Sequence, residues 1–404
     1  MNNKRVIIED NIIIKDRVCA AGSHMLYNFA PPFQATAVDR LLAAGWQLSG
    51  QTHVGEFAMG GTETCWFGPT ANPLNSGYLG AASAPALAGG LAEAALAVDC
   101  GDTLRLAAHS GCVAFRPSYG AVSRFGVIAN VSSCEQICAL APQVETAAAL
   151  LRDVAGHDSK DATSLPQEGY AFTVKPEVKG KRVALVENLL TQETNPQARQ
   201  AAEQAAAELA AAGARVDRVC LPYLDLAGPA YICMAAAEGC NNISRFDGVK
   251  YGYRCAKFKG IEELYRNSRS EAMGEQAKFT ALLGAYVLSK GNYEQYYYKA
   301  LQARRLVAQA WQELFDGYEA ALLPLAEGTA YPIDGERQEL AARTEADRCW
   351  SAPALIAGLP SLGLPRGQAK NGLPLALQIV AARGQEEQAL AVAAALEAVK
   401  GGAK

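Results

Sequence analysis

The chain of 404 residues has no apolar run close to the ~18 residues that a membrane-spanning helix needs. Its first residues, MNNKRVIIEDN, also lack the apolar core and the small-residue cleavage site of a secretory signal, so we expect a cytoplasmic protein without membrane contact. A strong charge of either sign is missing too. The net charge of −4 argues against direct binding of nucleic acid by this chain.

Patterns that bind metal are also missing. The chain has four histidines, and none stands in ligand spacing with a cysteine: His24, His53, His109 and His157. The eleven cysteines are scattered, and Cys134 and Cys138 lie four apart, as on one face of a helix. We therefore predict no metal and no cofactor, with most thiols buried as small hydrophobic groups.

Half of the residues are hydrophobic, and chains of this length bury about three quarters of their unfolded surface. Strand-like segments alternate with alanine-rich helical segments, which indicates an α/β protein. The expected strands begin at residue 5 and cover 46–52, 181–187, 214–221, 320–325 and 373–381. The expected helices cover 35–45, 84–96, 196–213, 385–399 and most of 261–315, and the polar stretch 158–177 is expected to be a connection.

Three segments carry a family resemblance: RVIIEDNI at 5–12, GAASAP at 80–85 and DCGDT at 99–103. Together with RPSYG at 116–120, they resemble the amidase signature family. In that family a lysine is the base, a serine on a cis peptide relays the proton, and the serine of an Asp-Thr-Gly-Gly-Ser loop is the nucleophile. The resemblance implies one α/β domain over 1–404, with a central mixed sheet covered by helices on both faces. It also implies that the helical segment before the lysine strand is missing.

All three catalytic positions of the family are changed in this sequence. Glu9 stands for the lysine, Ala82 stands for the cis-serine with Ser83 beside it, and Thr103 stands for the nucleophile. Asp102 replaces a glycine of the same loop. Since a free glutamate has a pKa about six units below that of lysine, Glu9 is expected to be a weak base that brings negative charge.

The loop 100–102 would supply the N–H groups that stabilise an oxyanion, and the Asp102 carboxylate opposes that role. Thr103 is either a rebuilt nucleophile assisted by Glu9 or Ser83, or an inert hydroxyl. We favour the inert hydroxyl, because catalytic groups act as a unit and the loss of one costs nearly as much as the loss of all. Cys100 is a weaker candidate, since Glu9 and Asp102 would raise its pKa.

A narrower resemblance lies outside the catalytic segments. NNISRFDGVKYGYR at 241–254 and YRNSRSEAMGE at 265–275 are similar to the A subunits of glutamyl-tRNA(Gln) amidotransferases. Such an A-type protein hydrolyses glutamine and sends ammonia to a B subunit, while a small C subunit joins the two. The resemblance implies B-type and C-type partners, with any tRNA held by a partner.

The positions that would hold glutamine in that family are also altered. Phe279 and Thr280 stand where adjacent arginines would bind the carboxylate, and Arg348 stands where an aspartate would hold the amino group. An apolar ring cannot replace a bidentate guanidinium. Both contacts to free glutamine are therefore expected to be lost or inverted in charge.

Two functions remain open on these residues. The first is a catalytically silent homologue of the A subunit that serves as a scaffold or regulator of an amidotransferase complex. The alternative is a divergent amide hydrolase that uses Thr103 on an amide other than glutamine, with a small-molecule amide as substrate. A product without any role is the third possibility. Retained surface motifs around a lost centre favour the first.

Overall fold

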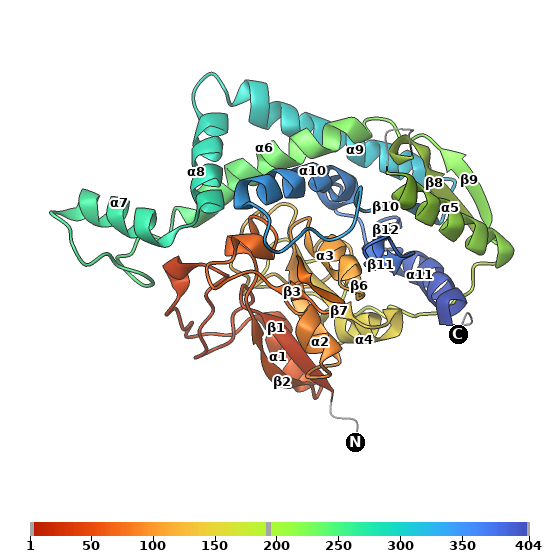
Figure 1. The fold of residues 1–404 in the computed structure, drawn as a ribbon, viewed down its shortest axis with the longest axis horizontal. Helices are drawn as coiled ribbons and strands as arrows, with labels where there is room; N and C mark the ends of the chain where they lie inside the picture. The colour runs from red at the N-terminus through yellow and green to blue at the C-terminus, as the bar shows by residue number, and fades with distance from the viewer. Residues whose placement is uncertain (1–3, 191–194, 402–404) are drawn as a thin grey trace.

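The computed structural model describes residues 4–190 and 195–401. A ten-stranded sheet forms its centre, in the order β2-β1-β5-β7-β6-β11-β12-β10-β8-β9, with helices on both sides (Figure 1). The strands of this sheet are β1 Arg5–Glu9, β2 Gln47–Thr52, β5 Ala94–Asp99, β6 Val113–Arg116, β7 Gln136–Ala141, β8 Arg182–Val186, β9 Arg215–Val219, β10 Ala320–Pro324, β11 Ser361–Arg366 and β12 Leu375–Val380. A separate short pair is β3 Ala71–Asn72 and β4 Asn75–Leu79.

Eleven α-helices surround the sheet in the described ranges 4–190 and 195–401. They are α1 Thr36–Ala43, α2 Ala84–Ala88, α3 Thr103–His109, α4 Val144–Val154, α5 Pro196–Ala211, α6 Leu224–Ile243, α7 Ile261–Ala272, α8 Glu275–Leu288, α9 Lys299–Phe315, α10 Arg337–Ile356 and α11 Glu386–Gly401. Short helical turns are η1 His24–Leu26, η2 Glu56–Ala58, η3 Thr62–Thr64, η4 Glu187–Leu189 and the π-helix η5 Glu294–Tyr298. None of the described helices is long and apolar enough to cross a membrane.

The predicted α/β class with a mixed sheet is confirmed. Strand β8 shows why both faces need cover, because Val183 and Leu185 enter one buried cluster while Ala184 and Val186 enter another. Successive side chains of a strand point to opposite faces, so two apolar layers must flank it. Helices α4, α5 and α11 pack on one face, and α6, α9 and α10 cover the other (Figure 1).

The predicted helix over 84–96 is wrong. Helix α2 ends at Ala88, because Gly89 and Gly90 follow and Gly90 has a φ of +68°, a left-handed conformation that favours glycine. The alanines from Ala94 onward then form β5, which is buried along its whole length between β1 and β7. Alanine favours helix only weakly, so burial in the centre of a sheet overrides that preference.

Other expected elements are confirmed with small changes at their ends. Helix α5 begins at Pro196, and the side chain of Asn195 accepts a hydrogen bond of 2.9 Å from the backbone of Gln197. This N-cap with a following proline is the start signal read in the sequence. The stretch 158–177 contains no helix or strand, as expected of a connection.

The pairing of the strands sets the position of the candidate site. Strand β1 pairs in parallel with both β2 and β5, and Ile8 lies opposite Leu96. Parallel strands carry their C-terminal ends to the same edge, so Glu9 at the end of β1 lies beside the last residues of β5. Helix α10 packs against this edge, because Ser351 on α10 contacts Gly101 in the loop after β5.

Candidate active site

The loop that would carry the nucleophile is built around a buried carboxylate. Asp99 ends β5, and its Oδ1 accepts hydrogen bonds from the backbone N–H groups of Gly101 (2.9 Å) and Thr103 (3.2 Å). Its Oδ2 lies 2.6 Å from Nη1 of Arg116, which is completely buried. Two N–H groups of the loop thus bind Asp99. The Asp99 carboxylate therefore fixes the conformation of the loop.

Gly101 is the one glycine that this loop needs. Its φ of +114° is rare for any other residue. A Cβ at this position would also lie 3.3 Å from Cδ2 of Leu355 and 3.5 Å from Oγ of Ser351, both on α10. The Ser351 hydroxyl donates to the carbonyl of Gly101 at 2.6 Å. The loop therefore packs directly against α10.

Glu9, Ala82, Asp102 and Thr103 line one pocket, as the order of the family segments led us to expect. Thr103, however, is not arranged as a nucleophile. Its hydroxyl donates to the carbonyl of Val98 at 2.9 Å. A nucleophilic hydroxyl needs a base within hydrogen-bond reach, and a carbonyl oxygen cannot accept its proton.

Glu9 is buried, and its surroundings favour the neutral form of its carboxyl. Burial raises the pKa of its carboxyl from 4.5 to about 8, against hydrogen bonds from the backbone of Val98 and from Ser83 that lower it. The negative charge that we expected here is therefore disfavoured, because burial opposes the ionised form. A protonated carboxyl cannot accept a proton, so the raised pKa leaves a smaller ionised fraction of Glu9 to serve as a base at neutral pH. Ser83 in turn lies 3.0 Å from the hydroxyl of Thr52.

Asp102 takes part in a buried ion pair that the sequence did not reveal. Its Oδ2 lies 2.6 Å from Nη2 and 3.0 Å from Nε of Arg348, and its Oδ1 lies 3.0 Å from Nη2 of Arg105. Arg105 also lies 3.4 Å from Asp347. Burial acts to raise the pKa of Asp102, but the charges of Arg348 and Arg105 outweigh it and hold that pKa below its ordinary value. The four side chains form a network without net charge.

The positions that correspond to the family's glutamine-binding residues line a second pocket. Phe279 and Thr280 from α8 line it together with Arg348, Asn130 and Tyr231. The ring of Phe279 is 54% exposed at its mouth, and Thr280 is buried. Because Asp102 lines the first pocket and Arg348 the second, their ion pair stands between the two. The guanidinium of Arg348 is therefore bonded to the carboxylate of Asp102 between the two pockets.

Cys100 is buried and is not activated. Its thiol contacts Oε2 of Glu135 at 3.9 Å, and its carbonyl accepts a hydrogen bond from the hydroxyl of Tyr231. Burial raises the pKa of the Cys100 thiol well above its ordinary value, with the nearby carboxylates of Glu135 and Asp99 acting in the same direction. Glu9, which we expected to contribute, is not among the main causes. No group of three metal-binding side chains occurs in ranges 4–190 and 195–401.

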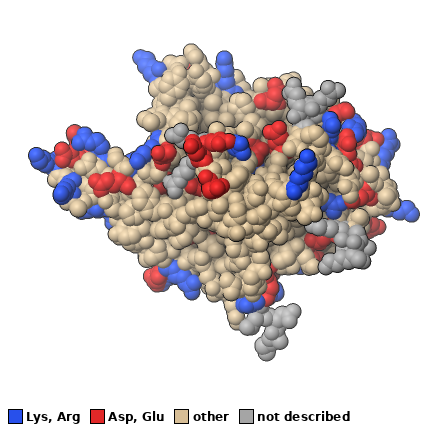
Figure 2. All heavy atoms as spheres, in the orientation of Figure 1, with Lys and Arg blue, Asp and Glu red and all other residues tan. Residues whose placement is uncertain are grey.

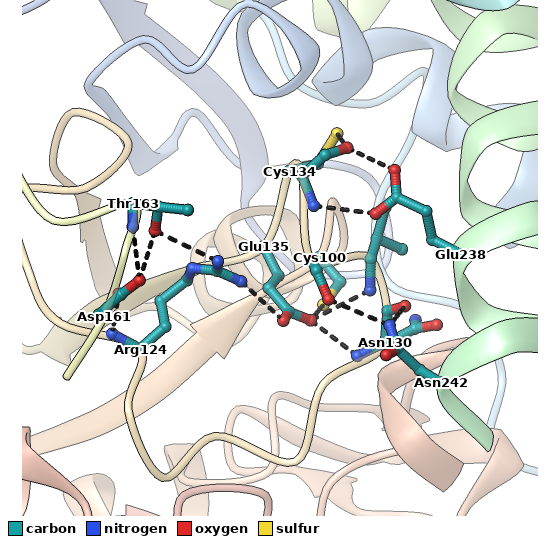
Figure 3. A network of polar contacts seen from close by, with 12 residues as sticks. Cys100, Arg124, Asn130, Cys134, Glu135, Asp161, Thr163, Glu238 and Asn242 are labelled. Carbon is teal, nitrogen blue, oxygen red and sulfur yellow. Dashed lines mark hydrogen bonds and ion pairs between the residues drawn. The ribbon is translucent and has the colours of Figure 1, made fainter. Parts of the chain in front are cut away.

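Glu135 connects the loop of Cys100 to neighbouring segments through hydrogen bonds and an ion pair (Figure 3). Its carboxylate accepts from the backbone N–H groups of Asn130 (2.8 Å) and Val131 (3.1 Å) and lies 3.1 Å from Nη1 of Arg124. On the α6 side, Asn242 donates to the carbonyl of Asn130 at 2.8 Å. These contacts connect the loop of Cys100 to the segments that carry Asn130 and Arg124.

Sequence reasoning overlooked five charged residues of this site: Asp99, Arg105, Arg116, Glu135 and Asp347. Arg105 follows Asp102 by three residues on one helical face, and that spacing is a signal for an ion pair. Asp99 and Arg116 lie in the segments DCGDT and RPSYG, which we used only for alignment. Glu135 and Asp347 gave no local signal, because their partners come from distant segments.

The raised pKa of Glu9 predicts a pH dependence that a Glu9→Gln variant removes. The folded state holds a proton on Glu9 that the unfolded state releases near 4.5, so the free energy of unfolding falls as pH rises from 4.5 to about 8. Within this range, Glu9 alone should lower the free energy of unfolding by about 1.4 kcal/mol per pH unit. Denaturant melts of wild type and Glu9→Gln across this range should diverge, whereas an exposed control, Glu262→Gln, should run parallel to wild type. Parallel profiles for Glu9→Gln would contradict the prediction.

The buried network predicts that Asp102→Gly, the family's residue, destabilises the chain. Removal of one member of a buried ion pair costs about 3–5 kcal/mol, because the partner charge stays buried. Adding Arg348→Asp should recover part of this loss, since the new carboxylate can face Arg105. Glu339→Ala, which removes an exposed pair with Arg343 on the same helix α10, should cost less than about 1 kcal/mol. Equal losses for the buried and the exposed pair in chemical denaturation would show that the network adds no stability.

Comparisons with known proteins agree with this geometry. The model of the Amidase family matches residues 6–390. The A subunit of glutamyl-tRNA(Gln) amidotransferase from Lachnospira eligens is 37% identical over 402 residues, which is 98% of this chain and 83% of the relative. The corresponding A subunit from Streptococcus pneumoniae is 38% identical over 402 residues, with coverage of 98% and 82%.

Two solved structures show the same architecture. The crystal structure of the A subunit of glutamyl-tRNA(Gln) amidotransferase from Thermotoga maritima superposes with a TM-score of 0.81 at 30% identity, over 97% of this chain and 82% of that one. The native peptide amidase from Stenotrophomonas maltophilia gives a TM-score of 0.77 at 26% identity, over 98% and 82%. With its fold, its loop frame and these matches in agreement, the chain belongs to the amidase family and is homologous to the A subunits of tRNA-dependent amidotransferases.

Proposed function

We propose that this chain has lost amidase chemistry and acts as a scaffold or regulatory partner in an amidotransferase complex. The observation that carries the proposal is the ion pair between Asp102 and Arg348, which lies where the two substrate-facing pockets would join. A neutral glutamine side chain cannot compete with a buried carboxylate for that guanidinium. The amino group of glutamine would also meet a cation where the family has an aspartate.

The catalytic groups support the same conclusion. Glu9 carries a proton at neutral pH, Ala82 has no hydroxyl, and Thr103 donates to a backbone carbonyl. Base, relay and nucleophile are therefore all unsuited to acyl transfer in this arrangement. Because such groups act as a unit, a residual rate from one of them would be small.

One observation favours the divergent hydrolase as a second candidate. The pKa of Glu9 is about 8, and a general base works best when its pKa is near the working pH. In alkaline solution an ionised Glu9 could accept a proton from Thr103, once that hydroxyl turns away from the Val98 carbonyl. This candidate predicts amide hydrolysis that rises through pH 8 and depends on both side chains.

Ammonia release separates the two candidates. With glutamine, asparagine or small aliphatic amides, the wild-type chain should release no more ammonia than buffer, while a catalytically intact A subunit serves as the positive control. Release above buffer that Thr103→Ala abolishes would refute the silent role. Glu9→Lys, Ala82→Ser, Asp102→Gly and Thr103→Ser together are expected to restore weak activity only when Arg348→Asp is added, because the Arg348 guanidinium otherwise remains in the substrate path.

The scaffold role predicts a stable complex, and α8 offers the surface to test. Phe279, Leu282 and Tyr286 follow a spacing of three and four residues, so they share one helical face, with exposures of 54%, 72% and 52%. Exposed apolar groups of this kind mark interaction surfaces. The chain should co-elute with B-type and C-type subunits from its own organism in size-exclusion chromatography, and Leu282→Arg should weaken co-elution.

Leu91→Arg is the matched control, because Leu91 is 59% exposed in the turn before β5, away from α8. It should leave the complex intact. Elution as a monomer with every partner tried, including an intact A subunit, would count against the scaffold role and favour the hydrolase.

A further inference from the structure

One segment of this acidic chain is strongly basic. Residues 250–269 contain two carboxylates, Glu262 and Glu263, whereas the whole chain has a net charge of −4. The same residues carry six cations: Lys250, Arg254, Lys257, Lys259, Arg266 and Arg269. They form the loop after α6 and helix α7, which projects from the body (Figure 1). Figure 2 shows Lys and Arg side chains at this projecting end, with Asp and Glu side chains among them. We call residues 250–269 the basic arm.

Most cations of the basic arm are left without a neutralising carboxylate. Among the described residues, no carboxylate forms an ion pair with any of the four cations of the loop: Lys250, Arg254, Lys257 and Lys259. The acidic side chains of this region accept hydrogen bonds from backbone N–H groups. Glu263 accepts from the N–H of Lys259 at 2.6 Å and lies 3.9 Å from Arg266, and Asp247 accepts from the N–H of Val249 at 2.8 Å. The loop therefore presents an excess of positive charge to solvent.

The loop is fixed by hydrogen bonds. Tyr253 donates its backbone N–H to the carbonyl of Met25 at 2.8 Å. Cys255 donates its N–H to Oγ of Ser268 on α7 at 3.0 Å, and the side chain of Asn267 donates to the carbonyl of Lys257 at 3.1 Å. A surface ordered before binding loses less conformational entropy when a ligand arrives.

Aromatic rings alternate with the cations. Tyr251, Phe258 and Tyr265 are 37%, 40% and 41% exposed, and the guanidinium of Arg254 lies 5.3 Å from the ring centre of Phe258. Each exposed ring is next to a cation in the sequence.

The rings continue from the arm onto the body. Tyr253 lies 4.7 Å from His24, and His24 stacks on Trp66 at 4.7 Å with an interplanar angle of 8°. Trp66 and Tyr27 are each 45% exposed. Exposed rings therefore occur both on the basic arm and on the part of the body that contacts Tyr253.

We propose that this surface binds single-stranded nucleic acid, with phosphates on the loop cations and bases stacked on the exposed rings. Interleaved cations and aromatic rings are the features that let proteins hold single strands without reading their sequence. An acidic protein surface fits less well, because three of the four loop cations are lysines, which are depleted at protein interfaces. The net charge of the chain predicted no such binding, since it averages over an uneven distribution. This inference goes beyond the scaffold role and does not depend on it.

The test measures binding of a fluorescent single-stranded RNA of about 12 nucleotides to the full chain by anisotropy. Affinity should fall steeply between about 50 and 200 mM salt. Lys257→Ala with Lys259→Ala should lower the slope of log K against log salt by about 1.4, since each lost phosphate contact contributes about 0.7. Phe258→Ala should weaken binding about fivefold or more at every salt concentration, because it removes a stacked base.

The matched control is Lys175→Ala with Lys179→Ala, which removes two exposed lysines from the connection near α11. It should leave affinity and slope unchanged. An equal loss for the control pair would overturn the proposal, because binding would then follow net charge alone. The absence of RNA binding at low salt would overturn it too. Binding of poly-glutamate as tight as that of RNA, with no effect of Phe258→Ala, would assign the arm to an acidic protein instead.

Discussion

The contact between Asp102 and Arg348 is the interaction on which the candidate site depends. Both residues are buried, and a buried charge is costly unless it is paired. Together with Arg105 and Asp347 they form a neutral set, and the set joins the loop after β5 to α10. The position of α10, the separation of the two pockets and the low pKa of Asp102 all follow from this set of contacts.

The loop around the candidate site is held by its own set of buried ion pairs. Asp99 with Arg116, and Glu135 with Arg124, hold the loop and the strand ends through buried ion pairs that involve none of the altered catalytic positions. Glu9 and Thr103 line the same pocket, where the Thr103 hydroxyl is bonded to a backbone carbonyl and burial raises the pKa of Glu9. The side chains that hold the loop are therefore different from those at the candidate catalytic positions.

The sequence allowed the class of fold and the convergence of Glu9, Ala82 and Thr103 to be predicted, since local patterns and the order of family segments specify both. It did not allow β5 to be recognised, because a run of alanines fits a helix and a buried strand equally well until its neighbours are known. The ion pair between Asp102 and Arg348 could not be predicted either, because the two residues lie 246 positions apart in the sequence. Arg348 was interpreted only as the loss of a contact to substrate. The ionisation state of Glu9 depends on burial, and burial follows from packing rather than from local sequence.

The paired charge change at Asp102 and Arg348 also limits the evolutionary routes that are open to this protein. A descendant in which only one of the two residues changed would pass through an intermediate with a disrupted buried ion pair, and selection for folding would act against it before any catalytic benefit appeared. Under the proposed function, the pair therefore makes the loss of the reaction hard to reverse. Drift can add further substitutions around the two pockets, but a return requires two coordinated changes at sites far apart in the gene.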